Sequence, residues 1–366
     1  MTRWYFEPPD QMARLASLAR ASLDRAGASD PGAHVMIVKT HRGAIERTPA
    51  TFLMKRTPFT PEEVGLIENV AARDGFEILY TPRTRPRNIF TAVLNAADPG
   101  RVWSEWPTNI APTYDNNPFF FNTLRPSQLG LLLNAPAEWR QTNLGTVVLF
   151  WLIAISAVMV LLFIVGPLAV ARREAIRRDT SRKLAALLYF VCLGAGFILI
   201  EVTLTQKFVL FLGHPVYALV VVLFSLLLFS GAGSALSSRF AGPDLRKAIT
   251  WMCAAIALLV LLGTLAASPA FHRLVHLPIA ARIAITVALI APSGLLMGMP
   301  MPTGIRLLSR ERPEIIPWAW GLNGAASVMG SVLALAIAIL TGFNQSLALG
   351  AAFYLLAILA IRRSSR

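Results

Sequence analysis

The fold is decided by the stretch from Gly194 to Ser234, which reads GAGFILIEVTLTQKFVLFLGHPVYALVVVLFSLLLFSGAGS. Two long apolar runs flank the short sequence GHP, and Glu201 and Lys207 are the only acidic residue and the only lysine or arginine in the stretch. Each run is long enough to cross the roughly 30 Å hydrocarbon core of a bilayer as a helix. The stretch therefore predicts a transmembrane helical hairpin.

Five further apolar runs of comparable length surround this hairpin, so residues 144–366 predict a bundle of about seven transmembrane helices. Composition agrees, because the chain is 55% hydrophobic and only 15% charged, whereas soluble domains are about a quarter charged. The predicted spans are Thr146–Val170, Leu184 to about Leu204, Val216–Ser237, Ala248–Ala267, Ala280–Met299, Trp318–Leu340 and Ser346–Ile361.

Basic residues are concentrated in the short connections of the membrane part. Residues 1–143 carry 16 Lys and Arg against 14 Asp and Glu, whereas the rest carries 18 against 6. Because basic loops stay in the cytoplasm, we expect a multi-pass protein of the bacterial inner membrane with a cytoplasmic C-terminus. Lipid, and not nucleic acid, is the partner that this charge pattern predicts. The basic connections are Ala171–Lys183, Arg239–Lys247, Arg306–Arg312 and the C-terminal tail.

The same rule places the soluble segment outside the cytoplasm, which conflicts with the absence of a signal sequence before it. Either the count of spans is off by one, or further sequence precedes Met1 or a partner chain completes the segment. We favour missing sequence.

Residues 1–111 predict a partial α/β segment. Apolar spacing indicates a helix from Asp10 to Ala26, and Thr60, Pro61 and Gly75 are typical of the ends of a second helix. The runs His34–Thr40, Thr51–Thr57 and Phe76–Pro82 read as strands, so the second helix joins two strands, as in a sheet covered by helices.

This segment lacks the Gly-rich turn of a nucleotide-binding domain, and its few strands make a thin sheet with open edges. A linker, residues 112–143, follows. It contains PTYDNNPFFFNTLRP, where Phe119 and its neighbours are expected to dock onto the bundle or the membrane interface. The alternative is that Asp115, Asn116 or Asn117 contacts a substrate.

Ionisable groups inside apolar runs are costly and face a bundle interior or a cavity. Glu201, Gln206 and Lys207 are therefore functional candidates, although the first and last lie about 240° apart around a helix. The alternative is that the span ends near Leu204, which places Gln206 and Lys207 at the headgroups. For His214, which lies beside Pro215 in a tight loop, we favour a role in the turn over a role as a ligand.

The membrane part also predicts its own helix contacts. Small residues four apart, as in Gly294–Gly298, Ala326–Gly330 and Ser327–Ser331, let helices approach closely. Pro300 in MGMPMPTG is expected to break the fifth span. Asn323 is expected to bond between helices, or else to join Glu201, Lys207 and the broken segment along a solute pathway. Cys192 and Cys253 read as buried apolar residues, and no metal spacing or nucleophile–base pair is present.

Several stretches resemble polytopic bacterial membrane proteins that carry a spermidine-synthase-like domain of the class I methyltransferase type. The resemblance spans nearly the whole chain, which looks like the C-terminal portion of such a protein. The matching stretches are TRWYFEPP, KRTPFTPEEV, YDNNPFFFN, GAGFILIEVTLTQKFVLFLGHPVYALVVVLFSLLLFSGAGS, GLLMGMPMPTGIRLL and IPWAWGLNGAASVMGSVLA.

The resemblance implies a Rossmann-like soluble segment, and full-length relatives that bind S-adenosylmethionine or its decarboxylated form to transfer a methyl or aminopropyl group. The cofactor-binding half has no counterpart in this chain, so no catalytic or cofactor-binding residue carries over, and we expect no activity from the chain alone. The alternative function is a small-solute transporter, with a polyamine as one candidate substrate.

Overall fold

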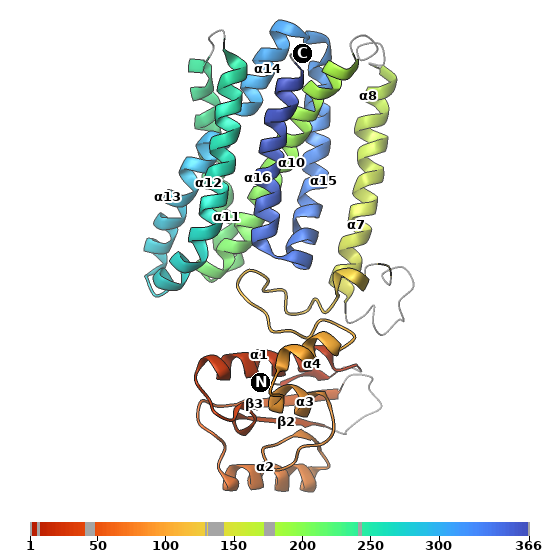
Figure 1. The fold of residues 1–366 in the computed structure, drawn as a ribbon, viewed down its shortest axis with the longest axis vertical. Helices are drawn as coiled ribbons and strands as arrows, with labels where there is room; N and C mark the ends of the chain where they lie inside the picture. Colours follow the sequence, from red (N-terminus) through yellow and green to blue (C-terminus); the bar gives the residue numbers. More distant parts are fainter. Residues whose placement is uncertain are drawn as a thin grey trace. The chain divides into compact units, whose positions relative to one another are not determined.

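The structure is a computed structural model that describes residues 2–5, 8–40, 48–128, 130, 143–171, 180–240 and 244–364 (Figure 1). It divides into two compact units. The first, the soluble unit, comprises residues 1–114 and 118–147, and the second, the helical unit, comprises residues 115–117 and 148–366. Three residues of the predicted linker thus belong with the membrane helices.

The soluble unit contains a four-stranded sheet in which all neighbouring strands are antiparallel. The strand order is β1-β3-β2-β4. Three of the strands lie where the sequence predicts them, within a few residues, and β1 was not predicted. The strands are β1 (Thr2–Tyr5), β2 (Val35–Lys39), β3 (Thr48–Met54) and β4 (Glu77–Tyr80).

The pairing differs from that of a doubly wound sheet. β2 and β3 follow each other along the chain and pair directly, so β4 pairs with the other side of β2. β3 and β4 are therefore parallel but separated by β2. The sequence indicated the strands but carried no signal for their partners, and a Rossmann-like segment is not established by this sheet.

Helices cover both faces of the sheet: α1 and α3 lie on one side and α2 on the other (Figure 1). The second predicted helix begins and ends as expected, because Thr60 and Glu63 form a capping box and Gly75 adopts a φ of 70°. Two helices of seven residues, α3 and α4, were too short to predict. The helices are α1 (Asp10–Arg25), α2 (Pro61–Asp74), α3 (Ile89–Asn95) and α4 (Pro99–Glu105).

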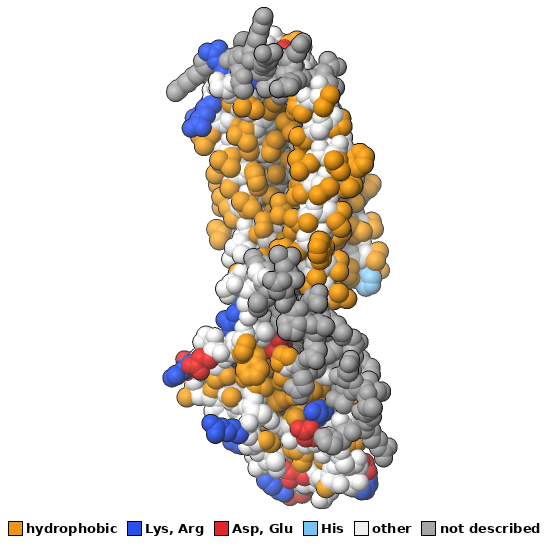
Figure 2. Space-filling model, turned by 90° about the vertical axis from the view of Figure 1, so that its right-hand side faces the viewer, with side chains coloured by type: hydrophobic (Ala, Val, Ile, Leu, Met, Phe, Trp, Pro, Cys, Tyr) orange, Lys and Arg blue, Asp and Glu red, His pale blue; other side chains and the backbone are white. Residues whose placement is uncertain are grey.

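Within the described residues, seven helical segments are long and apolar enough to cross a membrane, which agrees with the predicted number of spans. Figure 2 shows hydrophobic side chains over one face of the helical unit. The connection from Arg172 to Asp179 lies outside the described residues. The helices are α7 (Leu144–Val160, extended by a π-helical turn), α8 (Gly166–Ala171), α10 (Thr180–Leu212), α11 (Pro215–Leu236), α12 (Leu245–Leu274), α13 (Ile279–Met297), α14 (Pro300–Glu311), α15 (Ile316–Thr341) and α16 (Phe343–Arg363).

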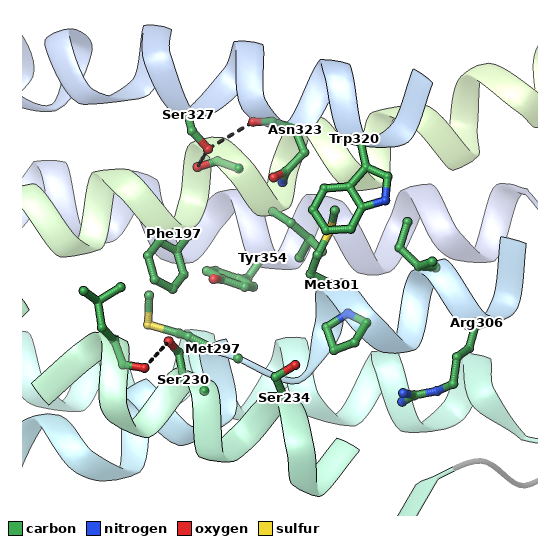
Figure 3. Close-up of a pocket in the computed structure, with 17 residues that line it drawn as sticks. Phe197, Ser230, Ser234, Met297, Met301, Arg306, Trp320, Asn323, Ser327 and Tyr354 are labelled. Carbon is green, nitrogen blue, oxygen red and sulfur yellow. Dashed lines mark hydrogen bonds between the residues drawn. The ribbon is translucent and has the colours of Figure 1, made fainter. Parts of the chain in front are cut away.

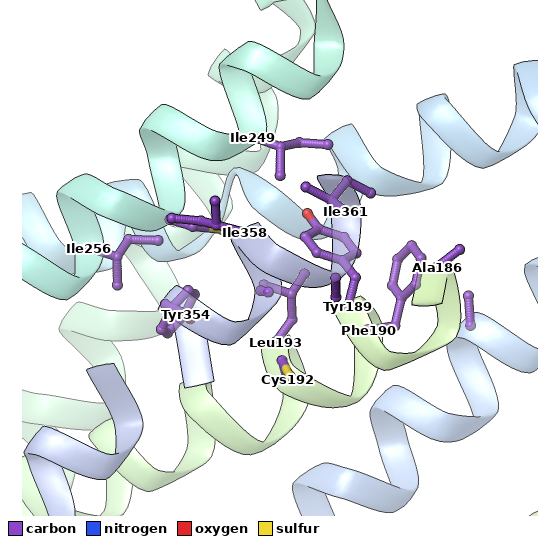
Figure 4. Close-up of a cluster of buried hydrophobic side chains, with 14 of the residues drawn as sticks. Ala186, Tyr189, Phe190, Cys192, Leu193, Ile249, Ile256, Tyr354, Ile358 and Ile361 are labelled. Atoms are coloured by element: carbon purple, nitrogen blue, oxygen red, sulfur yellow. The ribbon is translucent and has the colours of Figure 1, made fainter. Parts of the chain in front are cut away.

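Helix α10 is the central helix of the unit. Of its most apolar window, 61% is buried, against 11% for the first span. Tyr189, Cys192 and Leu193 of α10 pack with residues of α12 and α16 in the main core cluster (Figure 4). α10 continues to Leu212, so the helix extends eight residues past the predicted end of the span near Leu204. Both cysteines are free and buried.

Glycines let the helices of this unit touch backbone to backbone. A methyl group on Gly298 would overlap the carbonyl group of Ser230, and one on Gly233 would overlap the carbonyl group of Leu295. Helices α11 and α13 therefore meet through these two glycines, one of which belongs to the predicted Gly294–Gly298 pair. As expected, the fifth span breaks before Pro300, where α14 begins.

We expect Gly298→Ala to destabilise the helical unit by about 1–3 kcal/mol, because the added methyl group forces two packed backbones apart. The measurement is the free energy of unfolding in mixed micelles. Gly324→Ala is the matched control, since a Cβ at Gly324 meets nothing within 4 Å. Equal stability of the two variants would contradict the close contact.

Candidate functional site

Asn116 of the predicted linker caps the first turn of α16. Its carbonyl oxygen accepts a hydrogen bond from the Phe343 N–H at 2.8 Å, and its Oδ1 accepts one from the Asn344 N–H at 2.8 Å. Its Nδ2 donates to Gln345 Oε1 at 3.2 Å. The first amides of a helix lack partners within the helix, and the N-cap residue Gly342 has no side chain to supply one. A residue distant in the sequence performs this role instead.

Three other predicted residues gather around the same helix start. Lys207 is buried, and its Nζ donates to Asn344 Oδ1 at 2.8 Å. Asp115 lies 3.0 Å from His272 Nε2, with both side chains more than half exposed, and Asn117 donates to the Ile339 carbonyl at 3.3 Å. We call Asp115, Asn116, Asn117, Lys207 and Asn344 the α16 cap cluster.

The cap cluster positions the backbone at the start of α16. Asn116 and Lys207 use their polar atoms on Asn344 and its neighbours. The Asp115–His272 contact is exposed, and such pairs contribute little stability. The cluster therefore reads as a fastening between the linker and the α15–α16 turn.

The remaining membrane candidates lie elsewhere. Glu201 is half-buried on α10, and in the part of the chain that the structure describes its carboxylate forms no hydrogen bond or ion pair with another residue. Gln206 is exposed. His214 is the N-cap of α11, where Nδ1 accepts from the Val216 N–H at 3.2 Å. Asn323 Nδ2 donates to the Phe190 carbonyl of α10 at 3.0 Å, a bond between helices.

Phe119 lies in a loop held by Arg14 of α1. The Nη1 of Arg14 donates to the carbonyl oxygens of Phe119, Phe120 and Asn122, at 3.1, 2.9 and 2.5 Å. Arg14 is 3% exposed, and burial lowers the pKa of Arg14 to about 10 despite the opposing charge of Asp10. The loop is thus anchored within the soluble unit, and its expected docking onto the bundle stays a prediction.

A cavity of about 590 Å³ lies beside the break between α13 and α14 (Figure 3). We call it the broken-helix cavity. Phe197, Trp320 and Tyr354 contribute aromatic rings to its wall, and Met297 and Met301 flank the break. Irregular backbone at membrane depth is tolerated where it lines a cavity or is buried in protein. The break between α13 and α14 therefore lies where the cavity can accommodate its irregular backbone.

The polar groups of this cavity come from three helices. Ser230 and Ser234 line it from α11, Asn323 and Ser327 from α15, and Arg306 from α14. The sequence indicated Asn323 and the broken segment. It gave no signal for Ser230 or Ser234, and it placed Arg306 in a basic connection, whereas the structure places it inside α14.

Lys207 lines a second, smaller cavity of about 120 Å³, with residues such as Phe208, Thr264 and Ser293. Glu201 lines neither of these two cavities. The structure thus does not bring Glu201, Lys207 and Asn323 together with the broken segment along one pathway.

Arginines at the opposite end of the unit from the cap cluster close the C-terminal ends of helices. Arg246 donates to the Ile361 carbonyl at 2.6 Å and to Ser364 Oγ at 2.8 Å, and pairs with Glu311 at 2.5 Å. Basic groups at helix C-termini are favourable, because the last carbonyls are unpaired and partly negative. Part of the chain's basic excess is therefore structural.

Within the described residues, no group of three or more His, Cys, Asp and Glu could hold a metal ion. Comparison with protein-family models, with curated proteins and with solved structures gave no match. The functional argument therefore rests on the geometry of this chain.

We expect Asn116→Ala to weaken the start of α16 by about 1–2 kcal/mol, because the Asn344 amide loses its acceptor. Hydrogen exchange of the peptide spanning the α15–α16 turn should speed up about tenfold. Asn117→Ala is the matched control, since it removes a single long bond. Equal exchange in both variants and the wild type would show that the linker does not fasten this turn.

Proposed function

We propose that the helical unit binds a small amphipathic molecule in the broken-helix cavity, as the substrate site of a transporter does. The observation that carries the proposal is the coincidence of the break between α13 and α14 with a cavity of about 590 Å³. Transporters bind solutes at discontinuous helices, where freed backbone groups and a cavity meet.

The lining suits a largely apolar ligand. Small-molecule sites are mostly hydrophobic and aromatic, with a few polar groups that orient the ligand. Here the rings of Phe197, Trp320 and Tyr354 provide the apolar surface, and serines and Asn323 provide the polar groups. The described lining includes no carboxylate, so it offers a polyamine no charge partner.

A substitution at Gly231 tests this proposal. Gly231 lines the cavity, and a Cβ there would meet nothing within 4 Å. Gly231→Leu should therefore narrow the cavity, and its Cβ has room. We expect the purified variant to retain at most about a third of any co-purifying amphipathic molecule, counted by mass spectrometry of the extract, since the added side chain occupies space that the molecule needs.

The matched control is Gly324→Leu, which adds the same side chain at an exposed site on α15 with nothing within 4 Å of its Cβ. It should behave as the wild type. The same bound molecules at the same stoichiometry in all three proteins would overturn the proposal.

A second candidate function follows from the soluble unit, whose β1 lies at an edge of the sheet. β1 and β2 are parallel, are separated by antiparallel β3 and are joined through α1. We propose that further strands complete this sheet at β1, as the resemblance to spermidine-synthase-like membrane proteins implies. The completing portion would then hold S-adenosylmethionine or its decarboxylated form.

Membrane topology tests this second candidate, because cells hold that cofactor in the cytoplasm and the proposed inner-membrane orientation places Pro126 outside. Reporters active on one side only are fused at Pro126 and at the C-terminus. We expect the C-terminus to report cytoplasmic. A cytoplasmic Pro126 would favour the transferase reading, whereas an external Pro126 would rule out chemistry with a cytoplasmic cofactor.

A further inference from the structure

Arg306 is the one cation among the residues that line the broken-helix cavity in the described chain. It belongs to α14, between the break at Pro300 and the basic end of the unit. In Figure 3 its guanidinium lies at one end of the lining, whereas Phe197 and Tyr354 lie toward the other end. The cavity therefore has a charged end and an apolar end.

The hydrogen bonds of Arg306 leave part of its guanidinium available. Nη2 donates to the Ser237 carbonyl at 2.7 Å, to Ser237 Oγ at 3.1 Å and to Thr303 Oγ1 at 3.0 Å. Nε is buried and has no partner in the part of the chain that the structure describes. This Nε has no open surface, so a ligand in the cavity would be bound through Nη1, which is not buried and makes no hydrogen bond within the described residues.

No described carboxylate pairs with Arg306, although four other basic side chains of the unit, Lys183, Arg246, Lys247 and His272, do have acidic partners. A half-buried cation beside an apolar cavity is costly without a counter-charge. A bound ligand would therefore supply the negative charge that Arg306 lacks. A phosphate suits this role, because the planar guanidinium can donate to its oxygens.

The rim of the cavity is apolar and exposed. Leu227 of α11 is 59% exposed, and Trp320 of α15 is 58% exposed. Both side chains line the cavity, and between spanning helices such side chains face lipid. A ligand with an apolar tail can therefore extend past this rim into the bilayer, whereas a free anion gains nothing from it.

We propose that the broken-helix cavity binds an anionic phospholipid, with its phosphate on Arg306 and an acyl chain along Phe197, Met301 and Trp320. This inference rests on the proposed function, because it names the ligand class of the same cavity. Basic pockets between membrane helices on the cytoplasmic side bind lipid headgroups in this way.

The test measures lipid retention by native mass spectrometry of the full chain in neutral detergent. Dioleoylphosphatidylglycerol and dioleoylphosphatidylcholine are added in equal amounts. We expect the wild type to retain the anionic lipid about fivefold over the zwitterionic one, as one well-placed basic residue provides. Arg306→Gln should bring this ratio near one. Glycerol phosphate in excess should not displace the lipid, because it lacks the tail.

Three variants separate charge from structure. Arg306→Lys keeps the charge and should keep at least half of the preference. Arg310→Gln removes a neighbouring charge one turn further along α14, outside the lining, and should keep most of the preference. Gly231→Leu should lower the retention of both lipids.

The outcomes are distinguishable. If Gly231→Leu lowers retention but Arg306→Gln keeps the fivefold preference, the headgroup assignment is wrong and the cavity remains a binding site. If Gly231→Leu changes neither lipid, the cavity itself is not the site and both proposals fail. If glycerol phosphate displaces the lipid, the cavity recognises a free anion and the lipid assignment is overturned.

Discussion

The close approach of α10 to α15 and α16 is the contact on which the helical unit depends. A methyl group on Gly194 would overlap the Asn323 carbonyl group, and one on Gly350 would lie 2.7 Å from Ile200. Lipid tails are as apolar as the side chains, so helix association in a membrane rests on packing and on interhelical bonds. These glycines make both available, because only at this distance does the Asn323 side chain reach the Phe190 carbonyl.

Once α10 is fixed, the broken helix acquires its partners. The Tyr189 hydroxyl of α10 donates to the Pro300 carbonyl at 2.7 Å, and a methyl group on Gly304 would lie 2.5 Å from the Tyr189 ring. Thr303 Oγ1 donates to the Met299 carbonyl at 2.8 Å. Two polar side chains thus bond to carbonyl groups at the start of α14, where the Met299 carbonyl also accepts from the Thr303 N–H. The cavity lies beside the same break.

The number of spans could be predicted because a helix that crosses a bilayer must be about 20 residues long and mostly apolar, and both features can be read from a local stretch of sequence. The end of α10 could not, because Gln206 and Lys207 signal an end only if nothing inside the bundle pairs with them. Asn344 does pair with Lys207, and it lies 137 residues away. The strand partners in the soluble unit could not be predicted for the same reason. The residues of β3 and β4 predict strands, but nothing in them indicates that β2 lies between the two.

For the candidate polar residues, the sequence showed which ones are unusual in an apolar run, but it did not show where the fold places them. Rarity in an apolar run identified Glu201, Lys207 and Asn323 as unusual, and placement then separated them into an unpaired carboxylate, part of a helix cap and a helix-to-helix bond. Arg306 was not singled out, because a basic residue near a span end is ordinary in sequence. Its importance arises from α14, which resumes after the break and carries this charge back beside the cavity. A loop arginine would be surrounded by water, whereas Arg306 on α14 lies beside a largely apolar cavity.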